Sequence, residues 1–81
     1  MRYQYNTMGV CSSLIELDIQ DDIICEVLFK GGCDGNLKGI SRLVTGMRVQ
    51  DAVKLLAGIN CGSRDTSCPD QLSKALADWS E

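Results

Sequence analysis

The chain has 81 residues, a formal net charge of −3 and five cysteines, and it contains no histidine. A chain of this length predicts one domain over residues 1–81, with a marginal core that buries only about 60–65% of the unfolded surface. Its eight lysines and arginines are scattered, so the chain lacks the basic face of a nucleic-acid-binding protein. Domains this small are often stabilised by a metal, by disulfides or by oligomerisation, and the sequence leaves the oligomeric state open.

The first residues, MRYQY, are polar and lack the apolar segment of a secretory signal. No apolar run approaches the roughly 20 residues of a membrane span. We therefore expect a cytoplasmic protein that does not bind membranes, in a compartment where thiols stay reduced. An odd number of cysteines also fits a disulfide framework poorly, so clustered cysteines indicate metal or redox chemistry here.

Alternating apolar and polar residues predict three strands in the first part of the chain. Tyr3 and Tyr5 alternate with polar residues and indicate a short first strand. Residues 14–19 and 23–30 form the next two strands, and the polar turn at residues 20–22 joins them as a hairpin.

Cys25 lies within the third predicted strand. It alternates with Ile23, Val27 and Phe29, which places all four on one face of the sheet. We therefore interpret Cys25 as a small core hydrophobe rather than as part of a site.

Helical spacing predicts three helices, at residues 34–45, 49–57 and 67–79. Gly46 and Gly58 end the first two. The inward positions are Leu37, Ile40, Leu43 and Val44, then Val49, Val53 and Leu56, then Leu72, Ala75, Leu76 and Trp79. Strands followed by helices predict an α+β fold, in which a three-stranded antiparallel sheet has about three helices packed on one face.

The other four cysteines border the predicted elements: Cys11, Cys33, Cys61 and Cys68. Four thiolates complete a tetrahedral site for zinc or for an iron–sulfur cluster. Cys33 and Cys68 each lie at the start of a predicted helix, whose positive end stabilises a thiolate. The four element ends can converge at one edge of the sheet. No Cys-x-x-Cys pair is present, so four unrelated thiols remain the alternative, and without histidine a catalytic thiol has no base of that kind.

Polar residues beside these cysteines have capping interpretations. Ser67 with Asp70 predicts a weak capping box, and Pro69 suits the first turn of a helix. Asp34 and Asp70 each neighbour a site cysteine, and capping is the interpretation we favour for both. The glycine-rich segment 31–36 lacks the lysine of a phosphate-binding P-loop.

The segment 66–70 reads TSCPD, and it resembles the motif that names the TSCPD domain. Segments 31–37 and 62–72 also look like the short stand-alone bacterial proteins of that family. Related domains occur near the C-terminus of adenosylcobalamin-dependent ribonucleotide reductases. The resemblance implies four metal ligands, Cys11, Cys33, Cys61 and Cys68. It implies no catalysis, because the chain has none of the reductase barrel, so a reductase label would be inherited from the shared domain.

A second resemblance is to NifU/IscU-type scaffold proteins of iron–sulfur cluster assembly. Those scaffolds place one cysteine before a hairpin, a second in the turn after it and a third at the start of the last helix; Cys11, Cys33 and Cys68 follow the same order. Ser67 stands where that family often has a histidine, and Cys61 has no counterpart there. A fourth thiolate makes a closed site, and closed all-thiolate sites are usually structural.

The leading hypothesis is a small zinc-binding domain that has no catalytic activity alone and serves a protein partner. The alternatives are an iron–sulfur scaffold or carrier and a thiol redox module of a ribonucleotide reductase that cycles Cys61 and Cys68. The sequence does not distinguish zinc from iron, because both metals accept four thiolates.

Overall fold

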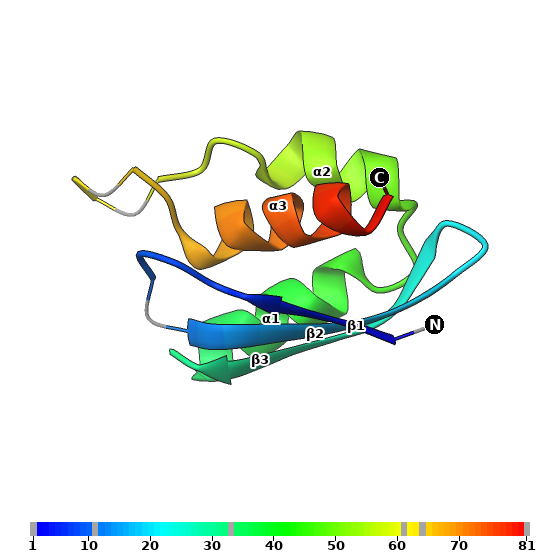
Figure 1. Cartoon of the computed structure of the whole chain (residues 1–81), viewed down its shortest axis with the longest axis horizontal. Helices are drawn as coiled ribbons and strands as arrows, with labels where there is room; N and C mark the ends of the chain where they lie inside the picture. Colours follow the sequence, from blue (N-terminus) through cyan, green and yellow to red (C-terminus); the bar gives the residue numbers. More distant parts are fainter. Residues whose placement is uncertain (1, 11, 33, 61, 64, 81) are drawn as a thin grey trace.

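The computed structural model describes residues 2–10, 12–32, 34–60, 62–63 and 65–80. It has the predicted α+β fold, a three-stranded antiparallel sheet in the order β1-β2-β3 followed by three helices (Figure 1). The elements are β1 (Arg2–Asn6), β2 (Ser12–Gln20), β3 (Ile23–Gly31), α1 (Asp34–Val44), α2 (Val49–Leu56) and α3 (Cys68–Ser80). Their bounds agree closely with the predicted ones, except that β2 begins earlier, at Ser12.

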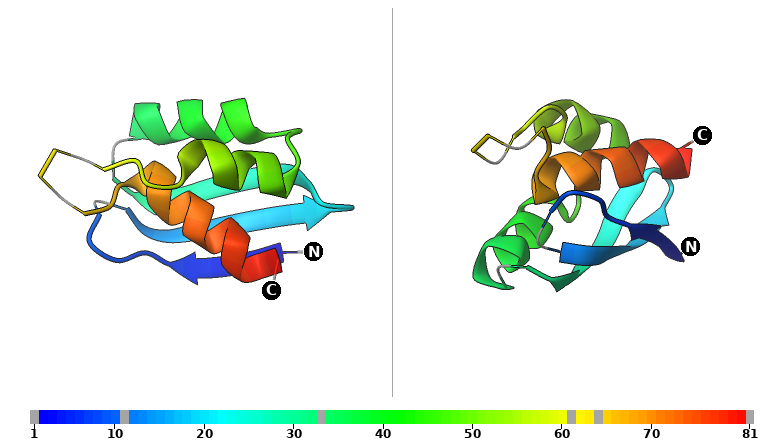
Figure 2. Two further views of the ribbon diagram at one scale, coloured as in Figure 1. Left: turned by 90° about the horizontal axis from the view of Figure 1, so that it is seen from above. Right: turned by 60° about the vertical axis from the view of Figure 1, so that its left-hand side comes forward.

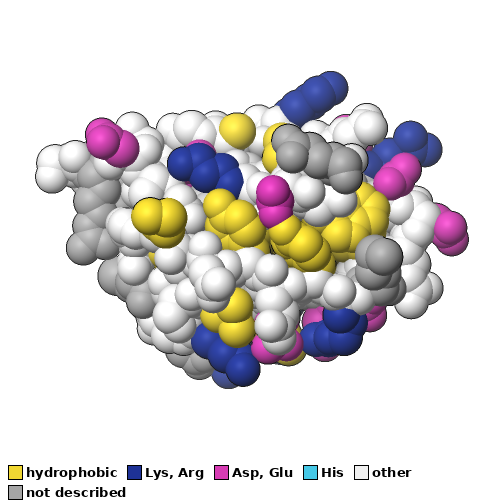
Figure 3. Space-filling view, viewed as in Figure 1, with side chains coloured by type: hydrophobic (Ala, Val, Ile, Leu, Met, Phe, Trp, Pro, Cys, Tyr) yellow, Lys and Arg dark blue, Asp and Glu magenta, His cyan; other side chains and the backbone are white. Residues whose placement is uncertain are grey.

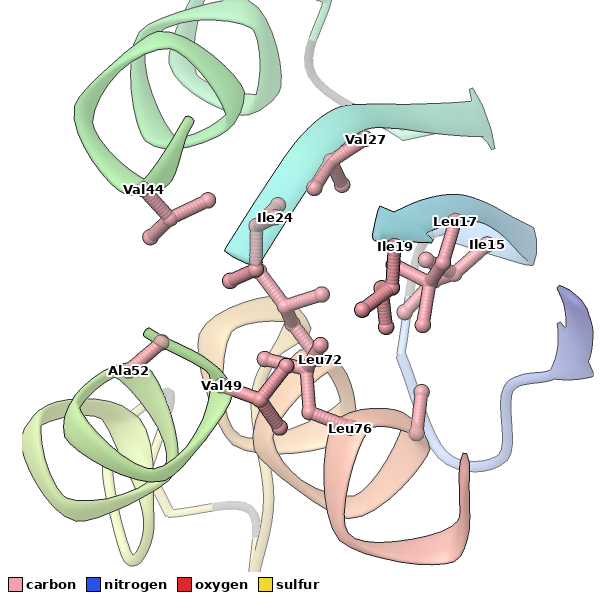
Figure 4. Close-up of a cluster of buried hydrophobic side chains, with 11 residues drawn as sticks. Ile15, Leu17, Ile19, Ile24, Val27, Val44, Val49, Ala52, Leu72 and Leu76 are labelled. Carbon is pink, nitrogen blue, oxygen red and sulfur yellow. The ribbon is translucent and has the colours of Figure 1, made fainter. Parts of the chain in front are cut away.

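One cluster of buried side chains joins the inner face of the sheet to all three helices (Figure 4). The sheet supplies Ile15, Leu17, Ile19, Ile24 and Val27, and the helices supply Val44, Val49, Ala52, Leu72, Ala75 and Leu76. Figure 3 shows a further band of hydrophobic side chains across one face of the molecule. Tyr3 and Tyr5 of β1 and Trp79 of α3 are partly buried against the core. The apolar periodicities in the sequence therefore identify most of the core.

The hairpin between β2 and β3 turns through two aspartates. Asp21 and Asp22 have φ angles of 52° and 64°, as a type I′ turn requires at both of its central residues. The Asp22 carbonyl accepts the backbone N–H of Val49 at 2.9 Å, and Ile24 donates its N–H to the Met47 carbonyl at 2.9 Å. The turn between α1 and α2 is thereby fixed to the start of β3.

The interpretation of Cys25 as a core residue is wrong, because the pleat shifts beside it. Asp18 pairs with Glu26 and Ile19 pairs with Ile24, so Cys25 is the extra residue of a bulge. Ile24 is fully buried and Cys25 is exposed. Strict alternation from Phe29 backwards had placed Cys25 on the inner face.

Leu43 of α1 is also not a core residue, since 79% of its surface is exposed. Leu37 and Val44 are buried and Ile40 is partly buried. Successive residues of a helix are turned by about 100°, so a helix that buries Val44 directs Leu43 to the side of that stripe.

Candidate metal centre

Cys68 is the one predicted ligand within the described residues, and it begins α3. Its thiol is free and half-buried, and its Sγ lies 3.2 Å from the Oγ of Ser12. Cys11, Cys33 and Cys61 lie outside the described residues. Cys68 and the chain segments next to the other three cysteines define the region of the candidate site.

Ser67, the residue directly before Cys68, forms two hydrogen bonds through its side chain. The backbone N–H of Asp70 donates to the Ser67 Oγ at 3.2 Å, as predicted for an N-cap residue. The Ser67 hydroxyl in turn donates to the carbonyl of Ile59 at 2.5 Å. One side chain thus caps α3 and holds the segment that follows α2 against the start of that helix.

The carboxylate of Asp70 has a larger role than a cap. It is buried, and it accepts hydrogen bonds from the backbone N–H of Gly58 at 2.8 Å and from the Thr66 hydroxyl at 2.5 Å. Lys74, one turn further along α3, lies 3.3 Å from the same carboxylate. The bond from Thr66 is the main reason why the pKa of Asp70 is lowered, although burial opposes it. Asp70 therefore closes the base of the loop between residues 58 and 66.

Gln71 joins the loop after β1 to the same motif. Its Oε1 accepts the backbone N–H of Met8 at 3.1 Å, and its Nε2 donates to the Thr66 Oγ1 at 3.0 Å. Gly9 has a φ of +73°, and a Cβ there would lie 3.3 Å from the Cγ2 of Thr66. No role was expected for Gln71 or Gly9 from the sequence, because the contacts of Gln71 with Met8 and of Gly9 with Thr66 join segments far apart in the chain.

Together these contacts bring several distant segments to the start of α3. Ser12 pairs with Gly31 across the sheet, so the start of β2 and the end of β3 are neighbours. Figures 1 and 2 show the start of β2, the end of β3, the start of α3 and the loop after α2 at the same end of the molecule. In sequence, Cys11 precedes Ser12, Cys33 follows Gly31 by two residues, and Cys61 follows Ile59 by two residues.

Within the part of the chain that the structure describes, no group of three or more Asp, Glu, Cys or His side chains is arranged to hold a metal ion. That part includes one of the four predicted ligands. Cys25, the second free thiol described, lies on β3 and is exposed.

None of the described helices is sufficiently long and apolar to span a membrane.

Searches of curated proteins and of solved structures found no match. The family model of the TSCPD domain, in contrast, matches residues 1–79, which include every segment of the candidate centre. The chain therefore belongs to the TSCPD domain family.

Proposed function

We propose that this protein is a small zinc-binding domain in which Cys11, Cys33, Cys61 and Cys68 hold one metal ion through four thiolates. The observation that carries the proposal is the 3.2 Å contact between Ser12 and Cys68. Ser12 adjoins Cys11, and it pairs with Gly31 near Cys33. The strand ends that adjoin Cys11 and Cys33 in the sequence therefore lie next to Cys68.

Two hydrogen bonds extend the argument to Cys61. The bonds from Ser67 to the Ile59 carbonyl and from Gly58 to Asp70 tie the loop that carries Cys61 to the first turn of α3. The chain has no histidine, so a four-coordinate protein site of the usual nitrogen and sulfur ligands would here use sulfur alone. Bound zinc would cross-link these four segments, and in small domains such sites contribute to folding.

The proposed cellular role is a structural one, in which the zinc-bound domain binds a protein partner. The resemblance to the C-terminal domains of ribonucleotide reductases suggests a reductase or one of its redox partners. In this role the domain acts by binding and carries out no reaction of its own.

The test is to measure metal content and the visible spectrum of protein purified without oxygen. We expect one zinc per chain and no colour, both in the wild type and in C25S. The variant C68S should lose most of the bound zinc, because a closed site loses one of its four ligands. C25S is the matched control, since the same substitution removes an exposed thiol outside the site. Wild-type protein with no metal and five free thiols would contradict the proposal.

An iron–sulfur scaffold is the second candidate. The observation that favours it is the position of Cys68 at the start of the last helix, with the hairpin of β2 and β3 between positions 11 and 33, as in the NifU/IscU-type scaffolds. Iron with acid-labile sulfide and a brown colour would establish it in place of zinc. A thiol redox module would instead show fast reaction of Cys68 with a thiol probe in the metal-loaded protein.

A further inference from the structure

A bulge in β2 directs Ser12 toward the start of α3. Ser12 pairs with Gly31 and Leu14 pairs with Lys30, so Ser13 is an extra residue between two regular pairs. In a regular strand Ser12 would share the outer face with Leu14, because side chains alternate. The bulge places Ser12 on the inner side instead, where 3% of its surface is exposed, and leaves Ser13 in solvent.

The surroundings of Ser12 hold its hydroxyl beside the thiol of Cys68. The Ser12 carbonyl accepts the hydroxyl of Thr7, and the Thr7 N–H donates to the Ser13 carbonyl at 3.2 Å. The backbone on both sides of the bulge is thus fixed by hydrogen bonds to the loop after β1. The Oγ of Ser12 lies 3.2 Å from the Sγ of Cys68, a distance that allows an O–H···S hydrogen bond.

From this geometry we infer that Ser12 is a positioning residue of the metal centre, whose hydroxyl donates a hydrogen bond to the thiolate of Cys68. The inference rests on the proposed function, because a metal-bound thiolate has no proton and acts only as an acceptor. The hydrogen bond orients the sulfur and stabilises its charge in a half-buried position. Groups of this kind, which bind a ligand rather than the metal, typically change metal affinity by about 10–100-fold when they are removed.

The test compares S12A with S13A. Both variants exchange a serine for alanine in the same bulge, but Ser13 is exposed and its hydroxyl donates to the Lys30 carbonyl rather than to sulfur. Zinc affinity is measured by competition with a chromophoric chelator. Cobalt(II) then replaces zinc, and the thiolate-to-cobalt charge-transfer band reports the electron density on sulfur. Circular dichroism of the metal-free proteins verifies the fold.

We expect S12A to bind zinc about 10–100-fold more weakly than the wild type and S13A to stay within about threefold of it. The charge-transfer band of S12A should move to longer wavelength, because a thiolate without a hydrogen bond gives up an electron more easily. Four sulfur ligands should remain, so the tetrahedral cobalt spectrum keeps its intensity. A role of Ser12 in folding alone would not move this band.

The two proposals fail differently. If the wild type binds no metal, the proposed function is wrong and the inference falls with it. If the wild type binds zinc but S12A matches S13A in both affinity and spectrum, only the role of Ser12 is wrong. Should S12A not fold, the pair S12T and S12V repeats the comparison, because threonine and valine have nearly the same shape and differ by the hydroxyl. Weaker binding by S12V than by S12T would support the inference, and equal binding would overturn it.

Discussion

The carboxylate of Asp70 accepts the backbone N–H of Gly58 at 2.8 Å, which joins the first turn of α3 to the second residue after α2. Because the Thr66 hydroxyl binds the same carboxylate, one buried charge holds the base of the loop that carries Cys61. The stability of the domain should therefore depend on Asp70 even without metal.

We expect D70N to lower the free energy of unfolding of the metal-free protein by about 1.5–3 kcal/mol, the usual range for a hydrogen bond to a charged group. The asparagine amide keeps one oxygen that can accept a hydrogen bond, but its NH₂ group would face either the Gly58 N–H or the Thr66 hydroxyl, which both donate to the carboxylate in the wild type. Urea denaturation at neutral pH measures the change. D65N is the matched control, since Asp65 is exposed in the same loop and its substitution should have little effect. Equal stabilities of D70N and D65N would contradict the structural role of Asp70.

Gln71 is expected to protect the Met8 amide from hydrogen exchange. The side chain accepts that N–H at 3.1 Å, and no element of regular structure includes Met8. In Q71A the Met8 amide should exchange faster than in the wild type, while amides in the centre of β2 keep their protection. NMR-detected exchange on metal-free protein gives both rates in one experiment. An unchanged Met8 rate would show that Gln71 does not hold this loop.

The turn between β2 and β3 offers a gain in stability. Asp21 and Asp22 both have positive φ, and Asn-Gly is the preferred pair for such a turn. The double variant D21N/D22G should raise the free energy of unfolding by about 0.5–1 kcal/mol, because glycine adopts this conformation without strain. G46A is the control, and it should lower the free energy of unfolding, since Gly46 has a φ of 91° and alanine is strained there. Thermal unfolding of the three proteins decides the matter, and a lower melting temperature for D21N/D22G would refute the prediction.

Glu16 links the three strands on the outer face of the sheet. Its carboxylate lies 3.3 Å from Lys30 and 3.4 Å from Arg2. The bond from Lys30, followed by that from Arg2, lowers the pKa of Glu16. A carboxylate whose pKa is lower in the folded state stabilises the protein above its unfolded pKa, and this contribution is lost as the pH falls through the folded value.

The melting temperature of the wild type should therefore fall more between pH 7 and acidic pH than that of E16Q. The difference is expected to be small and to shrink at high salt, because the ion pairs are exposed on the cationic side. Parallel pH dependences of the two proteins would show that these pairs contribute nothing measurable.

The number of thiols that react rapidly should depend on bound metal, and Cys25 is the thiol expected to react in either case. In zinc-loaded protein we expect one of the five thiols to react rapidly with Ellman's reagent, because Cys25 is exposed while four sulfurs are bound. The variant C25S should show no rapid reaction, and denaturation with a chelator should release its remaining four thiols. Rapid reaction of several thiols in C25S would contradict a closed site.

Local periodicity was sufficient for the elements, but not for the faces that two residues occupy. The helices and strands follow from apolar spacing and from end signals such as Gly46 and Ser67, which depend on near neighbours in the chain. Cys25 lies on the opposite face from the predicted one, and Ser12 lies outside the predicted strand and faces inward, because a bulge at each place shifts the alternation by one residue. A bulge depends on the partner strand, which local periodicity does not show. The bond between Gln71 and Met8 joins residues 63 positions apart, and no local pattern reveals it.

Residue type, position at the ends of elements and the TSCPD motif identify the candidate ligands. The structure adds what surrounds Cys68, and this part could not be derived from the sequence. The order of the strands and the path of α3 together decide that Ser12, rather than another hydroxyl, lies beside the sulfur. Asp70 was expected to cap the helix, but its carboxylate binds the loop before the helix instead.

The bulge at Ser13 also affects how chain lengths in this segment compare between proteins. Deleting Ser13 would restore a regular pleat, keep Ile15 and Leu17 in the core and leave Ser12 on the inner side, because Ser12 would then directly precede the outward-facing Leu14. A family member with one residue fewer at this point could therefore direct the same serine toward α3 without a bulge. In comparisons of TSCPD domains, a one-residue gap here thus does not by itself indicate a different site.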